Sequence, residues 1–268
     1  MKRLAQFARV VLVGIFLLTL FAGFLSPASY DMQFREAPNA SPSRTHPLGT
    51  DELGRDLLAR LLYGSRVSLL LAPAAAFLST AIAALIGGIA GYLGGWWERL
   101  ALAATDLSLS LPWFFLLVTL RALLPLNVAP VTSIVITFML LGVLGWASAA
   151  RVLCAGARTL RNADFLLQAR AYGSRKVRLL FRHVLPNLRP VLVAQFLISI
   201  PVFILGEANL GMLGLGVAEP LPSWGSLLRT LENYQSVLDN PLRLAPVGLL
   251  LVVITCFQLI LPREGFSS

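Results

Sequence analysis

Long apolar runs alternate with short polar segments along this chain. A helix that crosses the hydrocarbon core of a bilayer needs about 20 mostly apolar residues, and six runs approach or exceed that length. They lie at about residues 10–25, 67–93, 100–124, 131–150, 190–210 and 244–261. The pattern predicts an all-α, polytopic membrane protein with about six transmembrane helices.

The composition supports this class. Of the 268 residues, 57% are hydrophobic and 13% are charged, and the mean hydropathy is +0.76, whereas soluble domains are roughly 45–50% apolar and about 25% charged. The net charge of +9 raises nucleic acid as a partner. Most basic residues, however, flank apolar runs, as they do in the cytoplasmic loops of multi-span proteins. We therefore expect a cell-membrane protein that does not bind nucleic acid.

The distribution of Lys and Arg predicts the orientation. Residues 151–189 hold nine basic side chains against one acid, Asp164, so we expect this loop to be cytoplasmic. Six spans then put both termini in the cytoplasm, and three basic residues near the N-terminus agree. The loop 207–243 has four acidic and two basic residues, as an exterior loop can have.

The first apolar run has a second interpretation. A basic start, an apolar stretch and a small-residue site near Ser26–Ala28 are also typical of a cleaved signal peptide. The run is somewhat long for a signal core, and its loss would leave five spans.

A short amphipathic helix is expected before the second run. Thr50 is suited to the N-cap position, and Asp51 and Glu52 suit the first turn of a helix. The apolar face would consist of Leu53, Leu57, Leu58, Leu61 and Leu62. We expect this helix to lie on the bilayer surface or against the helical bundle.

Prolines and small residues within the apolar runs predict kinks and helix contacts. Pro112 and Pro201 are predicted to kink their helices. A ridge of small residues with a spacing of four predicts close helix packing; its members are Ala83, Gly87, Gly91 and Gly95.

Two acids lie at or near membrane depth. Asp106 interrupts the third run and Glu207 ends the fifth. Ionisable side chains are costly in hydrocarbon and indicate function by default, so both are candidates for the transport pathway. A structural alternative stays open for Asp106, which could bond to neighbouring backbone or to an arginine.

The densest basic cluster is the segment 164–187. Read as one helix, its apolar stripe comprises Leu166, Ala169, Gly173, Val177, Leu180 and Val184. Gly173 costs about 1 kcal/mol in a regular helix, so we expect a bend there between two short helices. The segment either rests on the inner leaflet or docks against a partner.

Motifs for catalysis are missing from the sequence. It contains no GxxxxGK[ST] phosphate loop, no Ser-His-Asp arrangement and no cluster of metal ligands, and its two cysteines and two histidines are isolated. We expect a non-catalytic chain with no cofactor or metal of its own. Energy for uphill transport would then come from a partner.

Four stretches resemble a known family. Residues 165–187, FLLQARAYGSRKVRLLFRHVLPN, are similar to the cytoplasmic coupling loop of ATP-binding-cassette (ABC) importer permeases, with Ala169, Gly173, Leu185 and Pro186 at matching positions. Leu167 and Gln168 depart from that motif, which has Glu and Ala there. HPLGTDELGRDLLARLLYGSRVSL (46–69) and AGYLGGWWERLALAATDLSLSLP (90–112) resemble the second permease of dipeptide and oligopeptide importers. GLGVAEPLPSWGSLL (214–228) resembles that family's exterior loop, and the likeness fades after the sixth run.

The resemblance implies the type I ABC importer permease arrangement. It divides the chain into an N-terminal part (1–66), a permease core (67–262) with a coupling loop at 151–189, and a short tail (263–268). It implies a heterodimer with a second homologous permease, two ATP-binding subunits that hold ATP and Mg²⁺, and an extracytoplasmic substrate-binding protein.

The resemblance also implies functional residues. Those expected to contact the ATPase are Leu167, Gln168, Ala169, Arg170, Ala171, Gly173, Val177, Leu180, His183, Leu185 and Pro186. On the exterior loop, Pro220, Pro222 and Trp224 would contact the binding protein, cover the pathway or simply anchor the loop. Alternatives are a self-contained secondary transporter that uses Asp106 or Glu207 for ion coupling, a permease for nickel or another non-peptide solute, and an integral-membrane enzyme.

Overall fold

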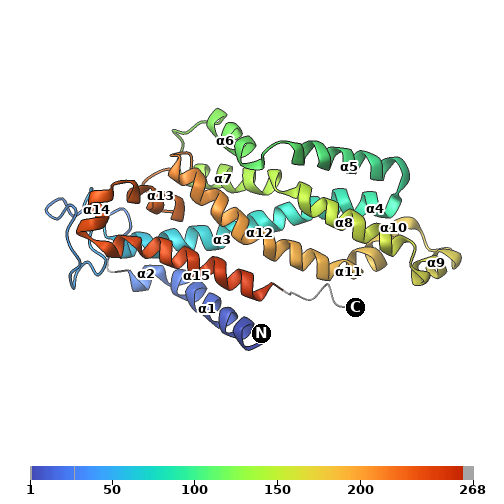
Figure 1. Cartoon of the computed structure of the whole chain (residues 1–268), viewed down its shortest axis with the longest axis horizontal. Coiled ribbons are helices and arrows are strands. Elements are labelled where there is room, and N and C mark those ends of the chain that lie inside the picture. The colour runs from blue at the N-terminus through green and yellow to red at the C-terminus, as the bar shows by residue number, and fades with distance from the viewer. Residues whose placement is uncertain (1, 27, 262–268) are drawn as a thin grey trace. The chain divides into compact units, whose positions relative to one another are not determined.

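The computed structural model describes residues 2–26 and 28–261, and within these ranges the chain is helical without any β-strand (Figure 1). Two isolated β-bridges, Gln33 with Arg55 and Thr50 with Asp56, lie in the loop before α3. The predicted tail at 263–268 falls outside the described residues. The chain forms two compact units: unit 1 comprises residues 1–72, 121–138 and 201–268, and unit 2 comprises residues 73–120 and 139–200.

Five helical stretches are long and apolar enough to cross a membrane. They are Arg3–Leu20, Leu57–Leu93, Pro130–Arg161, Arg189–Met212 and Pro241–Ile260. A sixth candidate is the pair α5 (Gly95–Ser110) and α6 (Trp113–Leu123), bent by 79°. The predicted interruption of the third run at Pro112 is confirmed, because the bend falls between Ser110 and Trp113. Pro201, in contrast, lies inside the single helix α12 (Arg189–Met212).

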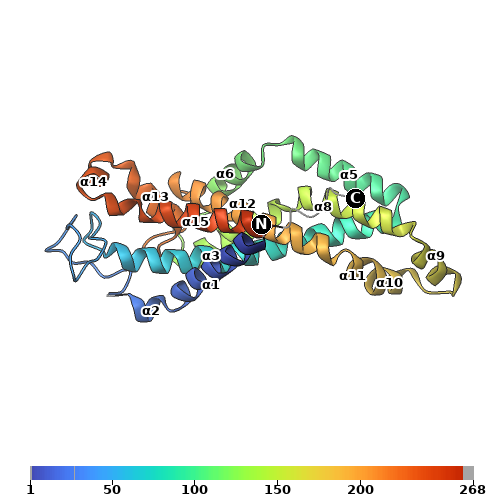
Figure 2. The same cartoon turned by 60° about the horizontal axis from the view of Figure 1, so that its bottom comes forward.

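Unit 1 contains both ends of the described chain. Its helices are α1 (Lys2–Leu20), α2 (Ala22–Leu25), α13 (Trp224–Arg229), η3 (Thr230–Glu232), α14 (Tyr234–Asp239), η4 (Pro241–Leu244) and α15 (Ala245–Ile260), with parts of α3 (Leu57–Ala83), α6, α7 (Pro130–Leu144) and α12. Figures 1 and 2 show α1 alongside α15, and the two helices are in contact. The first apolar run therefore belongs to the helical bundle of unit 1.

The predicted surface helix starting at Thr50 is wrong. Asp51 instead closes a tight turn, since its Oδ1 accepts hydrogen bonds from the backbone N–H groups of Leu53 (2.9 Å) and Arg55 (2.8 Å). The helix begins at Leu57, with the Asp56 carboxylate accepting from the N–H of Ala59 at 2.8 Å, as an N-cap does. From Leu57 the chain stays helical to Leu93, through the π-turn η1 (Ala84–Gly88) and α4 (Ile89–Leu93).

Unit 2 is built around α8 (Trp146–Arg161), which packs on η1 and α4. A Cβ on Gly87 would overlap the carbonyl oxygen of Ala150, and one on Gly91 would overlap that of Cys154. The predicted ridge is thus confirmed for Gly87 and Gly91, which bring two helix backbones into contact. It is wrong for Gly95, which has φ +61 and is the first residue of α5, beyond the end of α4.

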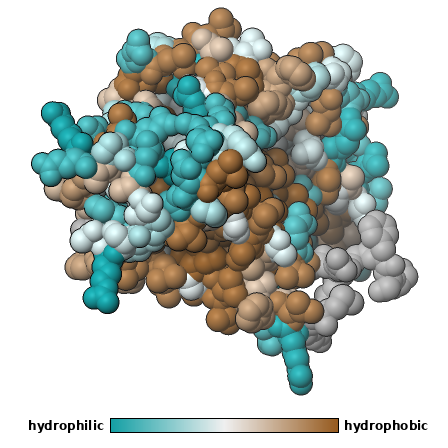
Figure 3. All heavy atoms as spheres, turned by 60° about the vertical axis from the view of Figure 1, so that its left-hand side comes forward, coloured by the Kyte–Doolittle hydropathy of each residue, from teal (hydrophilic) through white to brown (hydrophobic). Residues whose placement is uncertain are grey.

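Hydrophilic side chains gather at the loops of unit 1. Figure 3 brings forward the side of Figure 1 that carries α14 and the loop before α3, and a broad hydrophobic area lies beside the hydrophilic one. This separation is expected where a helical bundle leaves the hydrocarbon and its connecting loops enter water.

Candidate functional site

The segment 164–187 forms a bent, two-part element in unit 2. Its parts are α9 (Asp164–Ala171) and the continuous stretch of α10 (Lys176–Leu179), η2 (Leu180–Val184) and α11 (Leu185–Asn187). Gly173 has φ +78, and the N–H groups of Gly173 and Ser174 donate to the carbonyl oxygens of Arg170 (2.9 Å) and Ala169 (3.2 Å). Such a helix end with a left-handed Gly is a Schellman-type cap, and it confirms the predicted bend.

One side of this element is built into the core of unit 2. This core contains Tyr92, four residues of α8 and Leu188, which directly follows the element. The buried side chains that the element contributes to it are Leu166, Leu179, Leu180 and Val184. The single apolar stripe predicted for one helix is therefore wrong, because the turn at Gly173 changes the register. Leu180, expected at a partner surface, is buried in this chain's own core, whereas Val177 from the same stripe is 68% exposed.

The opposite side of the element faces away from the core. Of the residues predicted to contact an ATPase, seven are exposed: Leu167, Gln168, Arg170, Ala171, Gly173, Val177 and Pro186. Ala169, His183 and Leu185 are half-buried. Three exposed aromatic side chains were not predicted: Phe165, Tyr172 and Phe181. Tyr172 is 90% exposed at the bend, and a large aromatic ring at the tip of a charged loop is the sequence signal that could have identified it.

Two acids of α5 form ion pairs with arginines of α8. Glu98 accepts from Arg158 (3.3 Å) and Arg161 (3.5 Å), and Asp106 pairs with Arg151. The structural interpretation of Asp106, a bond to an arginine, is thus confirmed. Arg170 lies over the Tyr92 ring, 5.4 Å from its centroid, in a cation–π contact.

Several cations of the element remain without an ion pair to any described residue. They are Arg175, Lys176, Arg178 and Arg182. Arg189, the first residue of α12, is unpaired in the same way, and all five are exposed. The outward side therefore combines apolar and aromatic side chains with net positive charge, which suits an acidic partner surface.

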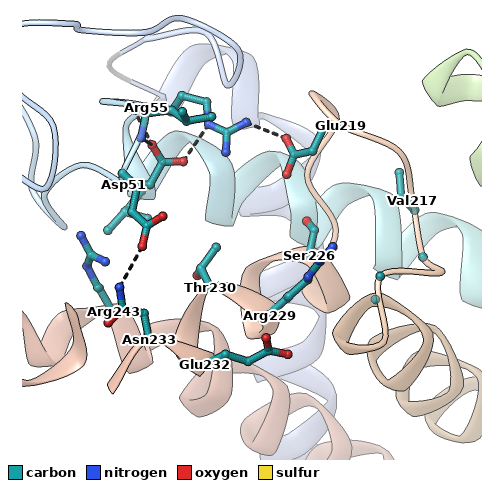
Figure 4. Close-up of a pocket in the computed structure, with 16 residues that line it drawn as sticks. Asp51, Arg55, Val217, Glu219, Ser226, Arg229, Thr230, Glu232, Asn233 and Arg243 are labelled. Carbon is teal, nitrogen blue, oxygen red and sulfur yellow. Dashed lines mark hydrogen bonds and ion pairs between the residues drawn. The ribbon is translucent and has the colours of Figure 1, made fainter. Parts of the chain in front are cut away.

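Unit 1 carries a second charged cluster, where the loop before α3 meets the loop after α12 (Figure 4). Arg55 donates through Nε to Asp51 at 2.7 Å and through Nη1 to Glu219 at 2.6 Å. The fully buried Arg60 donates to Glu219 at 3.0 Å, and its Nε lies 3.8 Å from Asp51. Two cations thus face two anions, and the cluster is neutral.

The charge of Arg55 is maintained by this arrangement. Burial by itself lowers the pKa of the Arg55 guanidinium, but the hydrogen bonds and charges of Asp51 and Glu219 raise it, and the net change is upward. A cation with a raised pKa contributes stability below its ordinary pKa and loses it only above the raised value. Arg55 is therefore charged at neutral pH.

A pocket of about 460 Å³ opens beside the cluster. Figure 4 shows Arg229, Glu232, Asn233 and Arg243 at its wall together with Asp51, Arg55 and Glu219. Arg243 donates to Asn39 (2.8 Å) and to the carbonyl oxygen of Thr50 (2.9 Å). Arg229 and Glu232 are exposed and form no ion pair within the described part of the chain.

The loop after α12 is fixed to the bundle by Trp224 and Glu207. Trp224 is fully buried and donates from Nε1 to Ser65 Oγ at 2.8 Å. Glu207 is fully buried too; Ser68 Oγ donates to its Oε2 at 3.3 Å, and its carboxylate lies beside Ser223 and Gly225. Of the three interpretations of this loop, anchoring agrees with the burial of Trp224, because the indole fills the bundle. Pro222 is also buried, and Pro220 is exposed.

Five to six apolar helices that are long enough to cross a bilayer define a polytopic membrane protein. Residues 83–262 match the family described as the binding-protein-dependent transport system inner membrane component. The chain belongs to this family and is a transmembrane permease subunit of an ABC importer.

Relatives of known name agree with this assignment. The dipeptide transport system permease protein DppC of Bacillus subtilis is 31% identical over 84% of this chain and 68% of its own length. The oligopeptide transport system permease protein OppC of the same organism is 29% identical over 97% of this chain and 83% of its own. OppC of Haemophilus influenzae is 31% identical over 94% of this chain and 79% of its own.

Proposed function

We propose that this permease forms half of a translocation pathway for peptides or similar small solutes, beside a second homologous permease. The names of its relatives, which are dipeptide and oligopeptide permeases, support this substrate class. Two ATPase chains would bind ATP and Mg²⁺, and an extracytoplasmic binding protein would deliver the solute. The chain itself is then a non-catalytic subunit.

The bent element at 164–187 carries the proposal. One side is anchored in the same core as α8, and the other presents Leu167, Tyr172 and Val177 among unpaired cations. A separate chain that grips the outward side would move α8 with it, because side chains packed in one core move together. Nucleotide-driven motion of an ATPase would in this way reach the membrane helices.

Coupling is tested by changing the bend without changing the surface. Gly173→Ala places a Cβ at φ +78, where L-residues are strained, although no other described atom lies within 4 Å of that Cβ. Gly95→Ala is a matched control, because Gly95 has φ +61, an equally open site and a place in the same unit. In the complex with its partner chains, G173A should lower ATP-dependent peptide uptake and G95A should not. Equal effects of the two variants would reject the proposed role.

Topology is a second test. The excess of basic residues in the 164–187 element supports a cytoplasmic location with both termini inside. Cys154 and Cys256 are buried, so single cysteines at Tyr172 and at Leu238, both exposed, can be labelled selectively. A membrane-impermeant maleimide added to intact cells should react at Leu238→Cys and not at Tyr172→Cys. The reverse pattern would overturn the orientation and remove the ATPase from reach of the element.

The pocket beside Glu219 is the proposed contact surface for the binding protein. It lies between two loops that the proposed orientation puts outside, and Arg229 and Glu232 offer unpaired charges there. Arg229→Gln should weaken stimulation of the ATPase by the binding protein, whereas Arg44→Gln, an exposed arginine in the first of these loops that does not line the pocket, should leave it unchanged. The same stimulation in both variants would exclude this pocket.

An uptake assay with this chain alone distinguishes the proposed ABC permease from a self-contained secondary transporter. Proteoliposomes that contain only this permease should accumulate no dipeptide under a proton or sodium gradient. Gradient-driven uptake that is lost in Glu207→Gln would instead establish ion coupling. Uptake by the full complex with nickel but not with peptides would reject the substrate class while leaving the importer assignment intact.

A further inference from the structure

An apolar groove of about 350 Å³ lies between α3 and α12 in unit 2, within the range of roughly 300–1,000 Å³ that small-molecule sites occupy. It is lined mainly by Phe77, Thr80 and Ala81 on α3 and by Leu192, Val193 and Phe196 on α12. Thr80 is the only one of the lining side chains with a polar atom. A path for polar solutes would need hydrogen-bonding groups along its wall, so this groove suits a hydrocarbon chain better.

A cation lies on α12 about one helical turn before the groove-lining residues of that helix. Arg189 is the first residue of α12, is exposed, and forms no ion pair to a described residue. Leu192, Val193 and Phe196 follow it at intervals of three, four and seven residues and so share its helix face. The helix rise puts Val193 about 6 Å and Phe196 about 10 Å beyond Arg189.

Arg189 also marks the end of the charged region. No charged residue occurs between Pro190 and Gly206, so the hydrocarbon-facing part of α12 starts directly after it. An arginine at that place can keep its guanidinium at the level of lipid headgroups while its stem covers apolar surface.

Unit 2 does not supply the counter-charge that Arg189 lacks. Its sequence contains ten basic residues and three acids, and no acid occurs from Phe165 to Gly206. Glu98 and Asp106 are already paired with other arginines. The third acid, Asp164 at the start of α9, forms no ion pair with Arg189 or with any other described residue. Arg189 is therefore free to pair with an anionic group of another molecule.

We propose that the groove and Arg189 form a site for one anionic phospholipid. The phosphate pairs with Arg189, and an acyl chain lies along Val193 and Phe196 against Phe77 and Ala81. A lipid fits both halves, because it combines a negative group at the interface with a hydrocarbon chain one to two helical turns deeper. The exposed Arg182 on the preceding element adds positive potential on the headgroup side.

The test uses the full chain in nanodiscs of phosphatidylcholine. A small fraction of the lipid carries a photoreactive acyl chain, and this photoreactive lipid is phosphatidylglycerol in one sample and phosphatidylcholine in the other. After irradiation, mass spectrometry locates the cross-linked residues. We expect cross-links at 77–84 and 192–196, with phosphatidylglycerol favoured about five-fold, since an interfacial cation contributes a factor of that size.

Two matched pairs of variants give the test its contrast. Arg189→Gln should abolish the headgroup preference, whereas Arg175→Gln, an equally unpaired cation at the bend, should retain it. Val193→Trp should reduce cross-linking at 77–84 by filling the groove, whereas Val202→Trp should not; these valines of α12 are 48% and 45% exposed. Even labelling of all apolar helices, equal labelling by both lipids, or loss of the groove cross-links when the second permease is co-assembled would each overturn the proposal.

Discussion

The backbone contact between η1 and α8 makes a prediction that distinguishes two adjacent glycines. A Cβ at Gly87 would overlap the Ala150 carbonyl oxygen, whereas a Cβ at Gly88 would lie 3.6 Å from a terminal methyl group of Leu185, an ordinary contact. Gly87→Ala and Gly88→Ala therefore each add one Cβ. At Gly87 the added carbon enters a crowded site, and at Gly88 it enters a site with room for it.

The expected difference follows from packing and propensity. Forcing an extra carbon into a packed contact costs about 1–3 kcal/mol, while Gly→Ala inside a helix gains up to about 1 kcal/mol. Both glycines lie in η1, so the propensity gain is common to the two variants, and they should differ by the packing cost of roughly 1–3 kcal/mol in the free energy of unfolding, with Gly87→Ala the less stable. At about 2–4 °C per kcal/mol, their midpoints of thermal unfolding should differ by roughly 2–12 °C.

The two cysteines provide the assay. Cys154 and Cys256 are buried in α8 and α15, so a thiol-reactive fluorescent dye reports unfolding as each becomes accessible on heating. The protein is measured in detergent and again in nanodiscs, to separate packing from micelle effects. Equal midpoints for the two variants, or a lower midpoint for Gly88→Ala, would show that the η1–α8 contact is not as close as described.

Further predictions concern the polar cap of unit 1 and the bent element of unit 2. Asp51→Asn leaves Arg55 and the buried Arg60 with only Glu219, which is 52% exposed, and should cost about 3 kcal/mol of stability, whereas the adjacent Glu52→Gln should change the thermal midpoint little. Trp224→Phe removes the hydrogen bond to Ser65 inside the bundle and should lower stability by about 1–2 kcal/mol without changing binding-protein stimulation per folded molecule. Tyr172→Glu at the bend should reduce co-purification of the ATPase chains, and Tyr234→Glu, an exposed tyrosine of α14, should not; loss in both would indicate a folding defect instead.

Local sequence signals predicted the membrane helices well. The apolar run at 190–210 corresponds to α12, which starts at Arg189 and ends at Met212, because a long apolar stretch next to an arginine has few other options in a membrane protein. The bend at Gly173 was also predictable, since a helix interior disfavours Gly and a left-handed cap favours it.

Two placements that the sequence did not predict depend on partners that are distant in sequence. Trp224 is buried because Ser65, 159 residues earlier, accepts its N–H, and no local pattern near Trp224 contains that information. Asp51 looked like a first-turn helix residue, yet Arg55 and Arg60 hold it in a turn together with Glu219 of the loop after α12. The roles of the ATPase-contact residues stay predictions, and their tests are the variants described above.

The helical stretch from Leu57 to Leu93 has 37 residues, which corresponds to a path of about 55 Å at 1.5 Å per residue. A bilayer has only about 30 Å of hydrocarbon. The stretch therefore contains more residues than one crossing requires, and its last part, η1 and α4 with their contact to α8, can extend beyond the hydrocarbon into headgroups and water.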